Sequence, residues 1–285
     1  MNGGLALPYL APSHRDQALA FLVAKSPRII AGCTDYYPGL QQGHHDEDVL
    51  DISRISGLRG ISQTSSGWRM GAATTWTDVV RTPLPAAFDG LKQAAREVGS
   101  IQIQNRGTVA GNICNASPAA DGVPPLLTLD AQIEIASVAG NRMVSLADFI
   151  TGVRQIALTR DEMVVAIQIP EIAETCQSSF IKLGSRKYLV ISIAMVAVAV
   201  RLDQDRIADL KIAVGSCSPV AKRLPGLEAG LLGASIDDLA SLDFGGQDYL
   251  APLTPISDVR GSSDYRLDIV AENCRRSVID ACARG

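Results

Sequence analysis

The sequence predicts a mixed α+β fold, for three reasons. Short segments with helical periodicity alternate with short apolar segments typical of strands through the first part of the chain. Two apolar segments at 196–202 and 207–214 then flank the polar turn Asp203-Gln204-Asp205, which predicts a β-hairpin. Apolar residues finally recur at helical spacing over 264–283. At 285 residues the chain is long enough for two domains, or one large one, with a substantial core.

The elements of the first part follow from local signals. Ser13 is expected to cap a helix that runs to about Ala24, and Thr34 or Asp35 is expected to cap a later helical turn. Strands are expected at 28–31, 49–52, 68–72, 132–136 and 163–169, the last ending at Pro170. Further helices are expected at 77–80, 86–98 and near Leu126. The segment 171–178 is polar and without pattern, and it is interpreted as the main domain boundary.

Composition excludes several classes of protein. The net charge is −4, so the chain has no overall bias toward nucleic acid or an acidic membrane surface. Its first residues lack the pattern of a signal peptide, and the longest uncharged apolar run, 189–200, is too short to span a bilayer. We therefore expect a cytoplasmic protein.

The cysteines and histidines do not form a recognisable metal-binding pattern. None of the six cysteines forms a CxxC pair, which argues against a zinc ribbon or an iron–sulfur cluster held by this chain alone. The adjacent His44 and His45 lie among acidic residues and are interpreted as part of a solvated loop. No metal site is predicted, and no catalytic acid or base stands out.

Two stretches of small residues are the best candidates for a binding site. They are AGCTD at 31–35 and NRGTVAGNICNASPAAD at 105–121. Each supplies backbone N–H groups and short polar side chains that suit an anionic group such as a pyrophosphate. Neither fits GxGxxG or GxxxxGK[ST], so a Rossmann fold and a P-loop are both disfavoured. From the pattern alone, ordinary tight turns with helix caps are an equally good interpretation.

A family resemblance favours the interpretation as a binding site over that of ordinary tight turns. AGCTD resembles the AGGTD loop of the flavoprotein subunits of molybdenum hydroxylases, and 105–121 resembles their RNxGTxGGNIxxASPxxD stretch. The likeness continues through KLGSRK at 182–187 and SDVRGSSDYR at 257–266, which is similar to the family's DVRAsaeYR segment. It covers nearly the whole chain, so the chain is identified as similar to the FAD-binding subunit of xanthine dehydrogenase and carbon monoxide dehydrogenase.

The resemblance implies a fold and a set of cofactor contacts. It implies a two-lobed FAD-binding domain of the vanillyl-alcohol-oxidase (PCMH) type at 1–172, with lobes at about 1–55 and 56–172. A smaller C-terminal domain of the carbon monoxide dehydrogenase flavoprotein type, an antiparallel sheet plus helices, would occupy 177–285. FAD would be bound non-covalently. The implied contacts are, for the pyrophosphate, Ile29, Ile30, Ala31, Gly32, Cys33, Thr34, Asp35, Tyr36, Thr108, Gly111 and Asn112; for the ribityl chain and ring, Ser117 and Asp121; and near the isoalloxazine, Lys182 and Ile191.

The resemblance also implies a function. The chain would take electrons from [2Fe–2S] clusters of an iron–sulfur partner subunit and pass them to NAD or another acceptor. A large partner subunit would carry the molybdenum cofactor and determine the substrate. Two alternatives stay open: a self-sufficient flavin oxidase of the same superfamily, and a non-catalytic assembly subunit that has lost FAD.

Several residues depart from the family pattern or have a second interpretation. Cys33 and Ala110 stand where glycines are usual, and a backbone with positive φ would cost about 1 kcal/mol at each. Ala110 is expected to fit less well than Cys33. Lys182 with Arg186 and Lys187 forms either a solvated basic patch or flavin contacts, and Asp121 is alternatively a helix cap.

Overall fold

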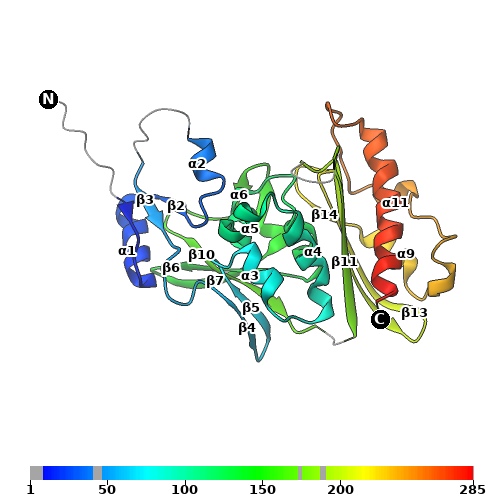
Figure 1. The fold of residues 1–285 in the computed structure, drawn as a ribbon, viewed down its shortest axis with the longest axis horizontal. Helices are drawn as coiled ribbons and strands as arrows, with labels where there is room; N and C mark the ends of the chain where they lie inside the picture. Colours follow the sequence, from blue (N-terminus) through cyan, green and yellow to red (C-terminus); the bar gives the residue numbers. More distant parts are fainter. Residues whose placement is uncertain (1–8, 41–46, 173–174, 187–190, 285) are drawn as a thin grey trace.

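The computed structural model describes residues 9–40, 47–172, 175–186 and 191–284, and it confirms the α+β class. Three regions follow one another along the long axis of the molecule (Figure 1). The helices of the described residues are α1 (Arg15–Lys25), α2 (Tyr36–Gly39), α3 (Trp76–Arg81), α4 (Asp89–Glu97), α5 (Ile101–Arg106), α6 (Val109–Asn115), α7 (Val123–Thr128), α8 (Leu146–Phe149), α9 (Pro225–Leu231), α10 (Gln247–Leu250) and α11 (Ser263–Cys282), with 3-10 turns η1 (Ala86–Phe88) and η2 (Ile236–Asp238). The strands are β1 (Tyr9–Leu10), β2 (Arg28–Ile30), β3 (Val49–Asp51), β4 (Ile61–Thr64), β5 (Gly67–Gly71), β6 (Gln132–Ser137), β7 (Gly140–Ser145), β8 (Ile150–Gly152), β9 (Gln155–Ile156), β10 (Met163–Pro170), β11 (Cys176–Leu183), β12 (Ala194–Asp203), β13 (Arg206–Gly215) and β14 (Lys222–Arg223).

The first region is a small parallel sheet in the order β1-β3-β2, packed against α1. Ala18, Leu19 and Leu22 form the buried face of α1. The predicted Ser13 cap is wrong: α1 begins at Arg15 with His14 at the N-cap position and no side-chain cap. The carbonyl oxygen of Ser13 accepts a hydrogen bond from the backbone N–H of Ser56 at 3.0 Å, which ties Ser13 to the segment after β3.

The middle region is an antiparallel sheet in the order β4-β5-β10-β6-β7, with helices α3 to α7 beside it. Its central strand β10 is apolar on both faces, and all its residues from 163 to 167 are buried. One apolar cluster extends from Ala18 in the first region to Ile169 in the middle region. The two regions therefore share a core, which fixes the loops that lie between them.

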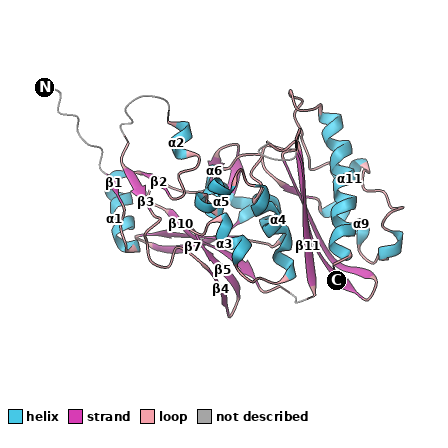
Figure 2. Cartoon of the chain, in the orientation of Figure 1, coloured by secondary structure: helices cyan, strands magenta, loops and turns pink. Residues whose placement is uncertain are grey.

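The third region is an antiparallel sheet in the order β11-β12-β13-β14, with helices on both faces. Helix α4 lies on one side of β11, and α9 and α11 lie on the other side (Figure 2). Along β12, Met195 and Ala197 pack with Ala94 of α4, whereas Val196 and Val198 share a cluster with α11. Burial on both faces explains why this strand reads as one continuous apolar run.

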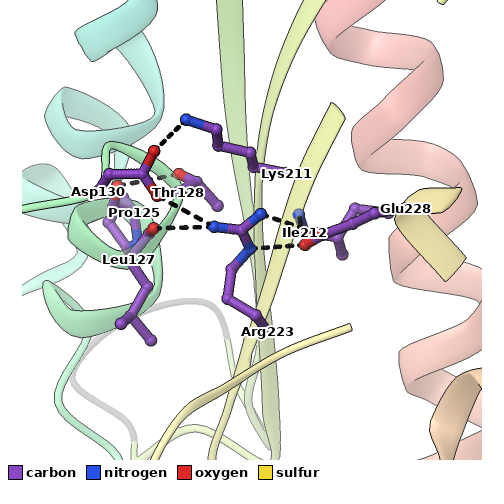
Figure 3. Close-up of polar contacts among 8 residues, drawn as sticks. All are labelled: Pro125, Leu127, Thr128, Asp130, Lys211, Ile212, Arg223 and Glu228. Atoms are coloured by element: carbon purple, nitrogen blue, oxygen red, sulfur yellow. Dashed lines mark hydrogen bonds and ion pairs between the residues drawn. The ribbon is translucent and has the colours of Figure 1, made fainter. Parts of the chain in front are cut away.

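Charged side chains connect the middle region to the third (Figure 3). Asp130 follows α7 and accepts a hydrogen bond from Arg223 Nη1 at 3.2 Å, and its other oxygen is paired with Lys211. Arg223 is also paired with Glu228 of α9, with Nη2 and Oε2 2.8 Å apart. These contacts fix the C-terminal end of α7 against β13 and β14.

Most predicted elements are present within one or two residues of their expected limits, including the hairpin β12–β13 and the last helix. The exception is β11, because Cys176, Gln177 and Ser178 belong to this strand and not to a boundary without pattern. Its hydroxyl groups have buried partners: Ser178 Oγ donates to the carbonyl of Ala86, and Ser179 Oγ to that of Ser277. Serines whose hydroxyl groups bond backbone carbonyls of distant segments resemble a polar linker when only the sequence is considered.

Candidate functional site

A cavity of about 1180 Å³ contains the predicted site. Its volume exceeds the range of roughly 300–1,000 Å³ typical of drug-sized ligands. All the predicted contact residues line it: Ile29, Ile30, Ala31, Gly32, Cys33, Thr34, Asp35, Tyr36, Thr108, Gly111, Asn112, Ser117, Asp121, Lys182 and Ile191. The fold thus brings residues from all three regions to one cavity, as the family pattern requires.

The first loop presents unbonded backbone donors. Strand β2 ends at Ile30 and α2 begins at Tyr36, so the residues between them belong to no regular element. The backbone N–H groups of Gly32, Cys33 and Thr34 donate to no other residue in the described part of the chain. Buried or half-buried backbone donors are nearly always paired, so these three are available to an acceptor in the cavity.

The two loops are in direct contact. A Cβ placed on Gly32 would lie 2.0 Å from the carbonyl oxygen of Arg106, so only glycine allows this approach. On the other side, Asn115 Nδ2 donates to the carboxylate of Asp35 at 3.2 Å. Asp35 is the N-cap residue of α2 but makes no side-chain cap, so its charge is directed to the second loop. The two loops thus face each other at the cavity.

The second loop is held in shape by its own polar side chains. Thr108 caps α6, with its Oγ accepting from the N–H of Gly111 at 3.0 Å. Asn112 Oδ1 accepts from the N–H of Gly122 at 3.2 Å and so closes the segment 112–122. The amide Nδ2 of Asn112 donates to no residue that the structure describes, which leaves a side-chain donor at the cavity.

The sequence predicted that Ala110 fits less well than Cys33 in place of glycine, and the structure shows the opposite. Cys33 has φ of +61°, in the left-handed region, whereas Ala110 is absent from the positive-φ residues and lies in α6, almost fully buried. Ala110 therefore fits without strain, and Cys33 is the strained residue. Burial raises the pKa of the Cys33 thiol, so the unreactive thiol form is favoured at neutral pH.

Asp121 and Lys182 form a buried ion pair at the cavity. The distance between Lys182 Nζ and Asp121 Oδ2 is 2.7 Å, and the two side chains are 8% and 9% exposed. Ser192 Oγ donates to the second carboxylate oxygen at 3.2 Å. Burial raises the pKa of Asp121, and the charge of Lys182 opposes this effect.

Two alternative interpretations from the sequence are thereby wrong. Lys182 is not part of a solvated patch, since its ammonium group is buried against Asp121 and also contacts the carbonyl of Glu97. Asp121 is not the cap of α7, whose N-cap residue is Gly122. Lys187 lies outside the described residues, as do His44 and His45.

The sequence reasoning missed one wall of the cavity, formed by residues 154–164. Arg154 Nη1 donates to the carbonyl of Asn115 at 3.1 Å, which joins this wall to the second loop. Glu162 accepts from Arg142 Nε at 2.6 Å and from the N–H of Thr159 at 2.9 Å. Bonding by Arg142 is the main reason that the pKa of Glu162 falls to about 2. No local motif marks Arg154 and Glu162, because Asn115 and Arg142 lie 39 and 20 residues away from them in the sequence.

The cavity fits a dinucleotide with a pyrophosphate such as FAD. Unbonded N–H groups lie where the two loops meet, and they suit the oxygens of a pyrophosphate. Within the described ranges no group of three or more His, Cys, Asp or Glu side chains is placed to hold a metal ion. None of the described helices combines the length and apolar character that crossing a membrane requires.

Comparison with known proteins agrees with this geometry. Residues 4–172 match the family model of the FAD binding domain in molybdopterin dehydrogenase, and residues 179–281 match that of the CO dehydrogenase flavoprotein C-terminal domain. The chain is 32% identical to the xanthine dehydrogenase FAD-binding subunit of Escherichia coli O157:H7, over 96% of each chain. It is 28% identical to the nicotine 6-hydroxylase medium subunit of Paenarthrobacter nicotinovorans, over 98% of each.

A solved structure gives the same result. A chain of the carbon monoxide dehydrogenase of Hydrogenophaga pseudoflava matches with a TM-score of 0.88 and 28% identity, over 98% of each chain. The matched residues include both loops of the cavity and the last helix. The chain belongs to the family of FAD-binding medium subunits of molybdenum-containing dehydrogenases, and it is a component of an oxidoreductase.

Proposed function

We propose that this chain binds FAD non-covalently in the cavity and acts as the electron-transfer subunit of a molybdenum-containing hydroxylase. The observation that carries the proposal is the contact between the two loops, with the free N–H groups of Gly32, Cys33 and Thr34 beside it. When bound there, FAD would supply the capacity to accept electrons from a partner's [2Fe–2S] clusters and to release them to NAD or another acceptor.

Each part of the cavity has a separate proposed role. Residues 29–36 would hold the pyrophosphate through the free N–H groups of Gly32, Cys33 and Thr34, and Asn112 would add its side-chain amide. Thr108 and Gly111 would line the same part of the site, with the Thr108 cap holding the second loop in shape. Ser117 and Asp121 would lie along the ribityl chain and the ring. Lys182 and Ile191 would lie near the isoalloxazine, and Lys182 brings a charge held in place by Asp121.

Non-covalent binding is supported by the state of the cysteines in the lining. A covalent flavin link through sulfur needs an accessible thiolate. Burial raises the pKa of Cys114 to about 12 and also raises that of Cys33. Neither thiol is therefore suited to attack a flavin at neutral pH.

The names of the relatives support the proposed partners, and the state of the cysteines supports the proposed location. Relatives are named medium subunits or medium chains of nicotine 6-hydroxylase and carbon monoxide dehydrogenase. We therefore propose an iron–sulfur subunit and a large molybdopterin subunit as partners, with no role for nucleic acid. A reducing cytoplasm suits a chain whose six cysteines are all free.

We also propose the domain limits 1–172 and 177–285, with lobes at about 1–55 and 56–172. The first domain would contain the cavity loops, and the second would add Lys182 and Ile191 to its rim. The alternative of an assembly subunit that has lost FAD rested on Cys33 and Ala110. This alternative is disfavoured for two reasons. Ala110 lies in α6 without strain, and the loop that contains Cys33 is in contact with Arg106 through Gly32.

Co-expression with the neighbouring genes tests the proposal. Native mass measurement is expected to find this chain in a complex with an iron–sulfur and a molybdenum subunit. The isolated flavin-loaded chain should be bleached by dithionite but should hydroxylate no heterocycle or aldehyde. A chain that stays alone beside its neighbours and oxidises an organic substrate unaided would instead be a self-sufficient oxidase.

A further inference from the structure

Arg266 is the most deeply buried arginine in the described part of the chain, and it lies in the first turn of α11. Its side chain is 3% exposed. Its guanidinium donates to three acceptors on three separate segments: the carbonyl of Ile193, the carbonyl of Ser216 at 3.2 Å, and the carboxylate of Asp258 at 2.8 Å. A buried charge is costly unless it is paired, so this arrangement needs a structural reason.

Two of these segments continue to the cavity. Ser216 donates its backbone N–H to the carbonyl of Pro118 at 3.0 Å. Ser192, next to Ile193, donates its hydroxyl to Asp121 at 3.2 Å. Two separate routes thus connect Arg266 to the segment 117–121 of the cavity lining. One passes through Ser216, and the other passes through Ile193 and its neighbour Ser192.

One of the acceptor residues, Ser216, has a disfavoured backbone conformation. Ser216 has φ of +64°, a left-handed conformation that disfavours a residue with a Cβ. Without Arg266, the carbonyls of Ser216 and Ile193 would each lose a charge-assisted hydrogen bond in the interior. The segment 117–121 would then lose the support of both routes.

We propose that Arg266 is a positioning residue that fixes the segment 117–121, and with it the Asp121–Lys182 ion pair, at the cavity. The inference rests on the proposed binding of FAD there. It gives a role to the segment 257–266, whose Asp258 and Arg266 are paired with each other although they lie outside the cavity lining.

Arg223 provides a matched control. It is also an arginine of the third region, but it bonds the middle region directly, through Asp130 (Figure 3). Its contacts are at the C-terminal end of α7, on the opposite end of that helix from the segment 117–121. Replacing Arg223 should weaken the contact between the middle and third regions without releasing the segment 117–121.

The test compares Arg266→Met with Arg223→Met in the full chain, by FAD titration, the visible spectrum of the bound flavin and thermal unfolding of the apo form. Arg266→Met is expected to weaken FAD binding about tenfold or more, roughly 1.4 kcal/mol, and to shift the flavin absorption bands. Arg223→Met is expected to lower the unfolding temperature while changing the Kd by less than about twofold. Equal effects of the two variants on Kd and spectrum would overturn the inference.

A double-mutant cycle keeps the test sharp if Arg266→Met folds poorly. Arg266→Lys retains the charge but cannot bond two carbonyls and a carboxylate in the same geometry. Its effect on the Kd should be non-additive with that of Ser192→Ala, because one of the two routes from Arg266 reaches Asp121 through Ser192, whereas Arg223→Met and Ser192→Ala should be additive. Additivity in both cycles would show that Arg266 is only structural. A wild-type chain that does not bind FAD would overturn the proposed function as well.

Discussion

At the scale of single residues, the two departures from glycine have opposite consequences. Cys33 occupies a left-handed conformation that glycine adopts freely, whereas Ala110 occupies a helix that alanine favours. Replacement by glycine should therefore change the free energy of unfolding in opposite directions at the two positions. The sequence does not show this difference in backbone conformation, because Cys33 and Ala110 each stand in place of a glycine.

We predict that Cys33→Gly stabilises the folded chain or leaves it unchanged, with at most about 1 kcal/mol gained from relief of positive φ. Ala110→Gly is expected to destabilise it by about 1 kcal/mol, because glycine is a poor helix former. Thermal or urea unfolding of both variants measures the difference. Retained FAD binding in Cys33→Gly would also show that the thiol is not needed to bind the flavin.

Gly32 gives a more direct test of the cavity. We predict that Gly32→Ala abolishes or severely weakens FAD binding, since the new Cβ would lie 2.0 Å from the carbonyl of Arg106 and separate the two loops. Gly226→Ala in α9 is the control, because a Cβ there finds only ordinary contacts, the nearest at 3.6 Å. FAD titration compares the two. Undiminished binding in Gly32→Ala would mean that the contact of the two loops is irrelevant to the site.

At the scale of elements, the sequence predicted what local pattern determines and missed what distant partners determine. The hairpin β12–β13 and the helix α11 were predictable because their apolar periodicity is complete. Strand β11 was not, because its serines are satisfied by Ala86 and Ser277, about ninety to a hundred residues away in the chain. The same holds for the wall at 154–164, which depends on Arg142 at the edge strand β7.

This wall leads to a prediction of pH dependence. The pKa of Glu162 is about 2 in the folded chain, below its ordinary value of 4.5. A carboxyl whose pKa falls on folding stabilises the ionised folded state above the unfolded pKa. Its contribution to the free energy of unfolding is thus complete above about pH 5 and is lost as the pH falls toward 2.

We therefore predict that Glu162→Gln lowers the unfolding temperature at pH 7, through the loss of charge-assisted hydrogen bonds with Arg142 worth about 1–3 kcal/mol. The difference from wild type should shrink as the pH is lowered below 5. Thermal unfolding of both proteins from pH 7 down to the lowest pH at which wild type is folded measures it. A difference that stays constant over that range would contradict the assigned role of this ion pair.

At the scale of the whole molecule, three regions contribute residues to one cavity. The first and middle regions share a core, and the third is attached through the packing of α4 and α7 against its sheet and through the bond from the Ser216 N–H to the carbonyl of Pro118. Such an arrangement suits a subunit whose own task is to hold and orient a cofactor, with substrate choice left to a partner. The family pattern placed all the predicted contact residues in the cavity, but only the fold shows how the third region supports them.

The central claim is that this cavity holds FAD without a covalent bond, and the most direct measurement is the flavin content of the purified chain after acid precipitation. We predict a yellow chain, close to equimolar in flavin, that releases FAD completely into the acid supernatant. The Gly32→Ala variant, treated in the same way, should yield little or none. A colourless wild-type chain that takes up no added FAD would contradict the claim that the cavity is an FAD site, and yellow colour that stays in the precipitate would contradict non-covalent binding.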